Sequence, residues 1–140
     1  MRGGDSEAGQ GESGMQIVEA VRRVLSNYAT FSGRAARPEY WWWVLAIVLG
    51  SFAAGLIDMA IFGDATVDDA PVQVVSAIFG LAILLPTLAV GARRLHDIDR
   101  TAWWLLLSLL PLIGTLVLLF FYVHPGTPGD NRFGPPAPAL

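Results

Sequence analysis

Three long apolar runs constrain this chain more than any other feature of its sequence. They cover residues 41–62, 71–92 and 103–123, and the only charged side chain within them is that of Asp58. As a helix, each run reaches about 30 Å, the thickness of the hydrocarbon core of a bilayer. The chain is 54% hydrophobic and 15% charged, which leaves too little polar surface to cover three such helices in a soluble protein. We therefore predict an all-α integral membrane protein with three transmembrane helices.

The sequence before the first run divides into two parts. Residues 1–14 are rich in glycine and acidic side chains, so we predict a disordered acidic tail. Residues 15–28 carry apolar side chains at three- and four-residue steps, which predicts a short amphipathic helix that lies in the membrane interface or packs on the spans or on a partner. Within it, Glu19 and Arg23 have the spacing of a helical ion pair. Met15 is an alternative start of translation to Met1.

The distribution of arginine predicts the orientation of the chain. Residues 29–134 form the predicted membrane domain, and residues 135–140 form a Pro-rich tail. The loop 63–70 contains acidic residues and no arginine, whereas the segments before the first run and after the second run are rich in arginine. Short cytoplasmic loops accumulate Arg and Lys. We therefore expect the N-terminus and the loop 93–100 in the cytoplasm and, after three spans, the C-terminus on the other side.

The third run contains two residues that interrupt helices. Pro111 lacks the N–H group that would bind the carbonyl of Leu107, and Gly114 follows one turn later. One interpretation is a kinked helix that still crosses the membrane. The other is a re-entrant hairpin that returns the C-terminus to the cytoplasm, which requires its broken backbone to be buried in protein or to line water. We expect the complete span, because each half alone is shorter than the roughly 20 residues that a crossing needs.

Three polar blocks resemble a known family. The blocks are FSGRAARPEYWWW (31–43), RRLHDIDRTAWWLLL (93–107) and HPGTPGDNRFG (124–134), and in this order they are similar to the signature blocks of a bacterial inner-membrane family, domain of unknown function 805. The resemblance implies a multi-pass protein of the bacterial inner (plasma) membrane, with no assigned activity; with three spans, its C-terminus is periplasmic. The chain departs from the family pattern at Ala36, Asp99 and Thr101–Ala102. Asp99 stands where the pattern has a glycine. Because its carboxylate can accept backbone N–H bonds in the first turn, we expect it to cap the third helix.

The polar blocks supply the candidate site residues, and three interpretations of them remain open. The arginines and tryptophans anchor the chain at the cytoplasmic interface, or the arginines bind anionic lipid headgroups or phosphate, or a cytoplasmic-face Arg/His/Asp cluster serves an enzyme or transport component. We also expect Arg93 and Asp97 to pair across four residues. The candidates for lipid or anion binding are Arg34, Arg37, Arg93, Arg94 and Arg100. A second group of polar residues, of unassigned role, comprises Glu39, His96, Asp97, Asn131 and Arg132.

Several functions are disfavoured by composition. The formal net charge of −3 provides no basic field, so we expect no nucleic-acid partner. The chain has no cysteine and only two histidines, which three spans would place on opposite sides, so we predict no metal site, no cofactor and no assigned catalytic residue. Asp58, the one ionisable residue of the spans, falls near the outer interface, which disfavours an ion path.

Small residues at four-residue steps suggest helix contacts. Ala46, Gly50 and Ala54 form one such series, and Ser51–Gly55 and Ser76–Gly80 are further pairs that allow close helix approach in lipid. They join the spans to one another or to a homo-oligomer or a larger membrane complex. We therefore expect a structural, interaction or anionic-lipid-binding protein of the bilayer, and an enzyme or transport component as the alternative.

Overall fold

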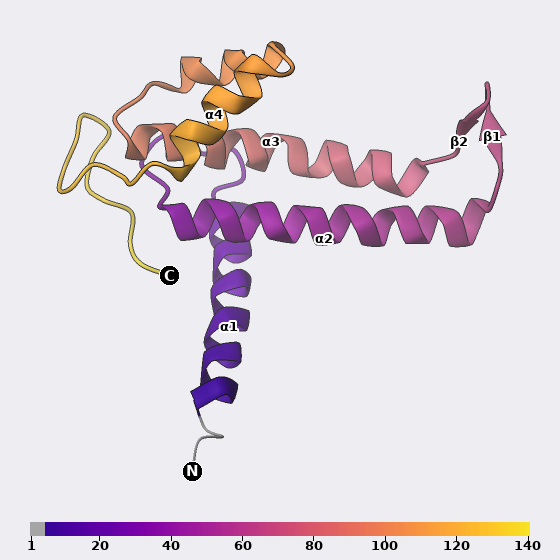
Figure 1. Cartoon of the computed structure of the whole chain (residues 1–140), viewed down its shortest axis with the longest axis horizontal. Coiled ribbons are helices and arrows are strands. Elements are labelled where there is room, and N and C mark those ends of the chain that lie inside the picture. Colours follow the sequence, from indigo (N-terminus) through magenta and orange to yellow (C-terminus); the bar gives the residue numbers. More distant parts are fainter. Residues whose placement is uncertain (1–4) are drawn as a thin grey trace.

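Two long antiparallel helices, α2 and α3, form the body of the molecule (Figure 1). The computed structural model describes residues 5–140, with side chains from residue 16 onward. Helix α2 spans Arg37–Phe62 and α3 spans Val74–Asp97; with 26 and 24 residues, they are roughly 36–39 Å long, enough to cross a bilayer. Between them, β1 (Thr66–Val67) and β2 (Ala70–Pro71) pair antiparallel, with Thr66 opposite Pro71.

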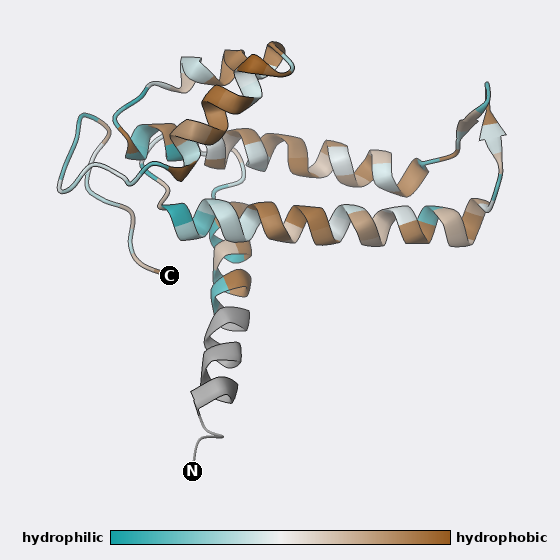
Figure 2. Ribbon diagram, in the orientation of Figure 1, coloured by the Kyte–Doolittle hydropathy of each residue, from teal (hydrophilic) through white to brown (hydrophobic). Residues whose placement is uncertain are grey.

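The surfaces of α2 and α3 are those of membrane spans rather than of soluble core helices. Only 11% of the apolar window of α2 and 22% of that of α3 is buried, and Figure 2 shows hydrophobic residues along the length of both helices. Side chains such as Phe52 and Leu81 are largely exposed. The first two predicted spans are therefore candidate transmembrane helices in the structure. Helix α3 begins later than expected because Pro71 belongs to β2, and it continues through the polar residues to Asp97.

Helices α2 and α3 approach closely at one of the predicted series of small residues. A side chain at Gly50 would collide with the ring of Phe79, since its Cβ would lie 2.5 Å from Cζ, and Ala54 is buried. In contrast, Gly55 and Gly80 have no atom within 4 Å of such a Cβ. The first series therefore serves the contact within the chain, while a homo-oligomer through the other small residues stays a prediction.

Helix α1, Asp5–Ser26, runs roughly perpendicular to α2 and α3 and meets them near one end (Figure 1). Its buried residues Ala20 and Val24 pack on the other helices, while Val18 and Leu25 remain exposed. The predicted Glu19–Arg23 ion pair is present at 3.8 Å. The helix begins at Asp5, so it includes part of the expected acidic tail; adding residues to an existing helix costs far less than nucleating one. Residues 1–4 of that tail lie outside the described residues.

The third apolar run is not one continuous helix, which corrects the expectation of a complete span over 103–123. It consists of a 3₁₀-helix, η1 (Ala102–Leu109), and an α-helix, α4 (Ile113–Val123). These two elements fold back on each other as a hairpin that packs on α3 (Figure 1). At 11 residues, α4 is well short of the roughly 20 needed to cross a bilayer.

Pro111 and Gly114 explain why the run turns. Because Pro111 has no N–H group for the carbonyl of Leu107, that carbonyl instead accepts the N–H of Leu110 at 2.9 Å, which closes the end of η1. The same carbonyl oxygen lies so close to Gly114 that a Cβ there would be 1.6 Å away. The hairpin therefore needs glycine at this position, and α4 returns directly against η1.

A second proline explains a contact between α1 and α3. Pro86 lies inside α3 and cannot donate to the carbonyl of Ala82, four residues earlier. The hydroxyl of Tyr28, just beyond α1, donates a hydrogen bond to this carbonyl. An unpaired carbonyl in a membrane is costly, so Tyr28 both satisfies α3 and fixes the position of α1.

Asp58, the ionisable residue of the first span, caps the beginning of α3. Its two carboxylate oxygens accept the backbone N–H groups of Val75 at 2.7 Å and Ser76 at 2.8 Å. These N–H groups belong to the first turn of α3, where no intrahelical acceptor is available. Asp58 is buried and joins α2 to α3 at the end opposite α1.

Candidate functional site

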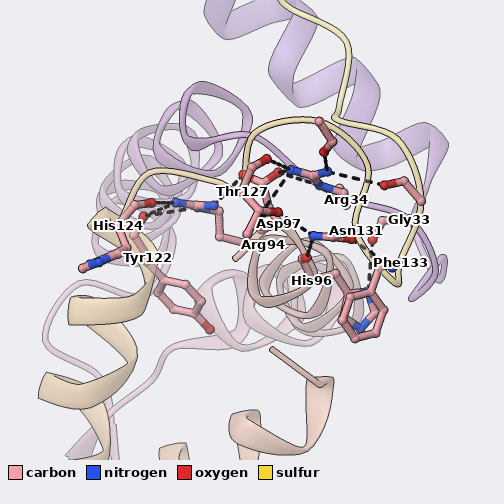
Figure 3. A network of polar contacts seen from close by, with 12 residues as sticks. Gly33, Arg34, Arg94, His96, Asp97, Tyr122, His124, Thr127, Asn131 and Phe133 are labelled. Atoms are coloured by element: carbon pink, nitrogen blue, oxygen red, sulfur yellow. Dashed lines mark hydrogen bonds and ion pairs between the residues drawn. The ribbon is translucent and has the colours of Figure 1, made fainter. Parts of the chain in front are cut away.

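Most polar side chains of the three blocks meet at the end of the molecule where α3 finishes. We name this the polar cluster: Arg34, Arg94, His96, Asp97, Thr127 and Asn131 (Figure 3). Three segments contribute: the loop that leads into α2, the last turn of α3, and the C-terminal segment (residues 124–134). The polar cluster lies beside an apolar core of residues from α1, α2, α3 and α4, which includes Val24, Trp43, Val90, Leu95 and Leu118.

The carboxylate of Asp97 is the centre of the polar cluster. Nε and Nη2 of Arg34 both lie 2.9 Å from its Oδ1, and Nη1 of Arg94 lies 2.7 Å from its Oδ2. All three residues are buried. Both carboxylate oxygens are thus occupied by guanidinium groups, which in a buried setting makes the ion pairs mutually dependent.

The two guanidinium groups carry more N–H donors than Asp97 can accept, and backbone carbonyls receive the rest. Arg34 donates to the carbonyls of Thr127 and Gly129, both at 2.6 Å. Arg94 donates to those of Tyr122 and His124. Since the carbonyls at the end of a helix lack intrahelical donors and carry partial negative charge, Arg94 caps α4. The two arginines therefore bind the hairpin and the C-terminal segment to α3.

The C-terminal segment in turn caps α3. Thr127 donates its N–H to the carbonyl of Asp97 at 2.8 Å, and Nδ2 of Asn131 donates to the carbonyl of His96 at 2.8 Å. Nδ2 of Asn131 also reaches Oγ1 of Thr127 at 2.8 Å. The last carbonyls of α3 are thereby satisfied by residues about 30 positions further along the chain.

His96 holds the entry to α2 and the C-terminal segment together. Its Nδ1 lies 3.0 Å from the carbonyl of Gly33, and because a carbonyl only accepts, Nδ1 carries the hydrogen. Its ring stacks on Phe133, with centroids 4.0 Å apart and planes 4° apart. His96 is 7% exposed, so its contacts are with the protein.

Arg93 makes a separate buried pair with Glu39 in the first turn of α2. Nη1 of Arg93 lies 2.7 Å from Oε1 of Glu39. The expected pairing of Arg93 with Asp97 is wrong: Asp97 pairs with Arg94, three residues before it. Consecutive residues point about 100° apart on a helix, so Arg93 faces α2 while Arg94 faces α4 and the C-terminal segment. Among the buried side-chain nitrogen and oxygen atoms of the described residues, Oε2 of Glu39 and Nε and Nη2 of Arg93 have no hydrogen-bond partner.

Two glycines belong to the site although the sequence pattern did not single them out. A Cβ at Gly126 would lie 2.2 Å from Oδ2 of Asp97, so only glycine lets the C-terminal segment approach the carboxylate. A Cβ at Gly91 would lie 3.2 Å from the hydroxyl oxygen of Tyr122. For Gly126, the only signal in the sequence was the high content of glycine and proline in the third block. Such a composition predicts turns, but it does not predict which surface the turns pack against.

The remaining cations of the predicted set are exposed. Arg37 donates to the carbonyl of Val123 at 3.4 Å, and the guanidinium of Arg100 stands over the rings of Trp104 and Phe121 at 5.4 and 5.3 Å. Arg132 pairs with Asp99 at 3.1 Å. Of the five arginines predicted to bind anions, only Arg37 and Arg100 are therefore exposed, while Arg34, Arg93 and Arg94 are buried in ion pairs.

Asp99 does not cap the following helix, contrary to expectation. The N-cap of η1 is Thr101, and it makes no side-chain cap bond. Asp99 has a φ of 59°, in the left-handed region that aspartate tolerates better than most residues. The turn that the family pattern builds with glycine is therefore built here with aspartate, whose carboxylate is directed to Arg132.

In chemical terms, the polar cluster binds segments of its own chain. Its carboxylate, guanidinium and imidazole groups all contact protein atoms. In the part of the chain that the structure describes, no three His, Asp or Glu residues are grouped so that they could hold a metal ion. Fold and site together define a helical membrane protein with two candidate spans, a hairpin whose helices are too short to cross a bilayer, and a buried polar cluster.

The chain belongs to a family of bacterial inner-membrane proteins without an assigned activity. Residues 28–135 match the family described as protein of unknown function (DUF805). The inner membrane protein YhaH of Escherichia coli (strain K12) is 44% identical over 113 residues, which cover 81% of this chain and 91% of the relative. The inner membrane protein YhaI of the same strain is 41% identical over 111 residues, covering 79% and 88%.

A more distant relative is also similar to the chain. The uncharacterized protein YiiR of Escherichia coli (strain K12) is 31% identical over 131 residues, which cover 75% of this chain and 84% of the relative. No solved structure matches the chain. The family assignment confirms the resemblance of the three blocks and supports an inner-membrane location.

Proposed function

We propose that this chain is a structural or interaction protein of the inner membrane, with two spans, a re-entrant hairpin in the cytoplasmic leaflet, and both termini in the cytoplasm. The observation that carries the proposal is the pair of contacts from Arg94 to the carbonyls of Tyr122 and His124. They hold the end of α4 beside the end of α3. A third span would separate these two ends by the thickness of the membrane.

A second contact supports a common side for the termini. Nη1 of Arg23, on α1, donates to the carbonyl of Pro138 at 2.7 Å, and Nη2 donates to that of Ala139 at 3.1 Å. The tail 135–140 therefore lies against α1. Because α1 runs across the direction of α2 and α3 (Figure 1), it is parallel to the membrane plane in this proposal, with Val18 and Leu25 toward lipid.

The charge distribution supports the orientation. Arginine is concentrated at the end of the molecule where α1, the polar cluster and the tail lie, while the loop 63–70 between α2 and α3 has only acidic charges. By the positive-inside rule, the arginine-rich end faces the cytoplasm. The broken backbone of the hairpin is satisfied in part within the hairpin itself, because the Leu107 carbonyl packs against Gly114 and accepts the N–H of Leu110.

A structural role is favoured over catalysis by the way the polar cluster is used. The convergence of His96, Asp97 and Asn131 is the arrangement that an enzyme would also need. However, both oxygens of Asp97 accept from arginine, and Nδ1 of His96 donates to a backbone carbonyl. The enzyme interpretation then relies on Nε2 of His96, the imidazole nitrogen that does not face Gly33.

Cysteine labelling tests the proposed topology, since the chain has no native cysteine. Cysteine would be introduced singly at the exposed positions Ser26, Asp69 and Asp130, and labelled in cells with a membrane-impermeant thiol reagent before and after permeabilisation. We expect Asp69→Cys to label at once, and Ser26→Cys and Asp130→Cys only after permeabilisation. If Asp130→Cys labels together with Asp69→Cys, the third run spans the membrane and the proposal fails.

A conservative substitution distinguishes structure from chemistry at His96. In His96→Asn, the side-chain amide N–H replaces the Nδ1 hydrogen toward Gly33, but no titratable group remains. A structural role predicts normal complementation of a deletion strain and unchanged labelling. Complementation lost at normal membrane levels, with labelling unchanged, would favour the enzyme interpretation.

A further inference from the structure

The strongest unassigned feature is a hollow on the hairpin beside an exposed cation. Trp103, Trp104, Leu106 and Leu107 of η1 line it. It is a shallow depression that is open to its surroundings and has a volume of about 310 Å³, at the lower end of the roughly 300–1,000 Å³ typical of small-ligand sites. We name it the η1 hollow. Its lining is mostly apolar, so we expect it to accommodate an apolar group of a ligand.

Arg100 supplies a charge next to Trp104, one of the residues that line the η1 hollow. Its guanidinium stacks over Trp104, which itself lines the hollow, at 5.4 Å from the ring centroid. Stacking uses the face of the guanidinium and leaves its in-plane N–H groups available. Arg100 is exposed and, among the residues that the structure describes, it forms no ion pair; the exposed Arg22 and Arg132, by contrast, each have a carboxylate partner.

We propose that Arg100 and the η1 hollow together bind one anionic phospholipid, whose phosphate pairs with Arg100 and whose acyl chain lies against Trp103, Trp104, Leu106 and Leu107. A free guanidinium attracts phosphate through charge-assisted hydrogen bonds, and the apolar lining matches the chain that follows a headgroup into the membrane. Arg100 stands at the start of η1, where the chain leaves the polar region. Along the chain, the charge of Arg100 comes first and the apolar residues of η1 follow. A phospholipid has the same order, with the charged headgroup first and the acyl chain after it.

This inference goes beyond the proposed function and depends on two features, the cytoplasmic position of Arg100 and the η1 conformation that forms the hollow. That position is the same whether the third run is re-entrant or complete, since Arg100 precedes the run in both cases. The buried arginines take no part, because Arg34, Arg93 and Arg94 are occupied by protein partners. The site is thus narrower than the five-arginine set expected from the sequence.

Lipid retention by the purified full-length protein tests the site. The protein in detergent would receive equal amounts of phosphatidylglycerol and phosphatidylcholine, and bound lipid would be counted by native mass spectrometry. We expect phosphatidylglycerol to be preferred, and Arg100→Gln to weaken its binding about tenfold, the loss typical of one charge-assisted hydrogen bond. Leu106→Asn, which leaves the cation intact, should weaken both lipids.

Arg22→Gln is the matched control, since the Arg22 side chain is 74% exposed on α1 and remote in sequence from the η1 hollow; it should retain phosphatidylglycerol as the wild type does. Excess glycerol 3-phosphate, which has the charge but no acyl chain, should not displace the lipid. Equal binding of the two lipids by the wild type, an unchanged Arg100→Gln variant, or displacement by glycerol 3-phosphate would each overturn the site. The cysteine-labelling result is independent of these outcomes.

Discussion

The two ends of α3 are capped by opposite chemistry. At its beginning, one carboxylate from α2, that of Asp58, accepts two backbone N–H groups. At its end, the backbone N–H of Thr127 and the side-chain amide of Asn131 donate to its carbonyls, while Arg94 extends from α3 to the carbonyls of α4. Each end of a helix presents the polarity that its partner neutralises. The first end is closed by one residue, whereas the second is a network joining three segments.

The difference indicates where the fold is vulnerable. Loss of the single cap frees two N–H groups and leaves the rest of the molecule in place. Loss of one charge in the polar cluster leaves buried partners without compensation, and the hairpin and the C-terminal segment lose their attachment to α3. Four substitutions measure this contrast, each by the free energy of unfolding in mixed micelles of mild and denaturing detergent.

Asp97→Asn should have the largest effect. It removes the negative charge between Arg34 and Arg94 and leaves two buried guanidinium groups unpaired, for which we expect a loss of about 3–5 kcal/mol. Asp130→Asn, a change of the same type at an exposed position, should be nearly neutral. Equal stability of the two variants would show that the ionic centre does not hold the hairpin.

Gly114→Ala should follow, at about 1–3 kcal/mol, because the added methyl group would overlap the carbonyl of Leu107. The matched variant is Gly80→Ala, which enters open space within a helix and should be neutral or stabilising in the isolated chain. If both changes leave stability unaltered, η1 and α4 are not in close contact.

Asp58→Ala should cost about 1–2 kcal/mol, the usual loss for removal of a helix cap. The expected consequence is local, so Asp130→Cys should label as it does without the change. Asp64→Ala, in the exposed loop, is the control. A change in the labelling of Asp130→Cys would mean that the two ends of α3 are coupled, which would remove the contrast between them.

Tyr28→Phe should have the smallest effect, about 1 kcal/mol, since it removes one hydrogen bond to the carbonyl of Ala82. A double-mutant cycle sharpens the assignment. In a Pro86→Ala background, the helix itself supplies the missing N–H donor, so the loss from Tyr28→Phe should shrink. An undiminished loss would show that the hydroxyl does not compensate for the proline.

The sequence identified the two candidate spans and every residue of the polar cluster except Thr127, but not how those residues pair. Apolar length is a local property, and it found α2 and α3 to within a few residues. Arg34 and Asp97 are 63 positions apart, and no periodicity relates them. The sequence located the interruption of the third run at Pro111 and Gly114 and offered the re-entrant hairpin as an alternative. The complete span was expected because a count of apolar residues does not show that the Leu107 carbonyl finds its donor in Leu110.

The pairing of Asp97 illustrates the same limit at short range. Helical spacing allows both Arg93 and Arg94 to reach it, and the sequence favoured the four-residue step. Tertiary contacts decide otherwise, since Glu39 on α2 engages Arg93. Gly126, which a close approach to Asp97 requires, was visible only as one turn residue among several.

The hairpin and α1 also give the molecule an uneven width. They broaden it at the end that carries the polar cluster, whereas α2 and α3 alone continue to the other end (Figure 1). With the proposed orientation, the protein displaces more lipid from the cytoplasmic leaflet than from the periplasmic one. A wedge of this shape is sensitive to the lateral pressure of the leaflet it enters.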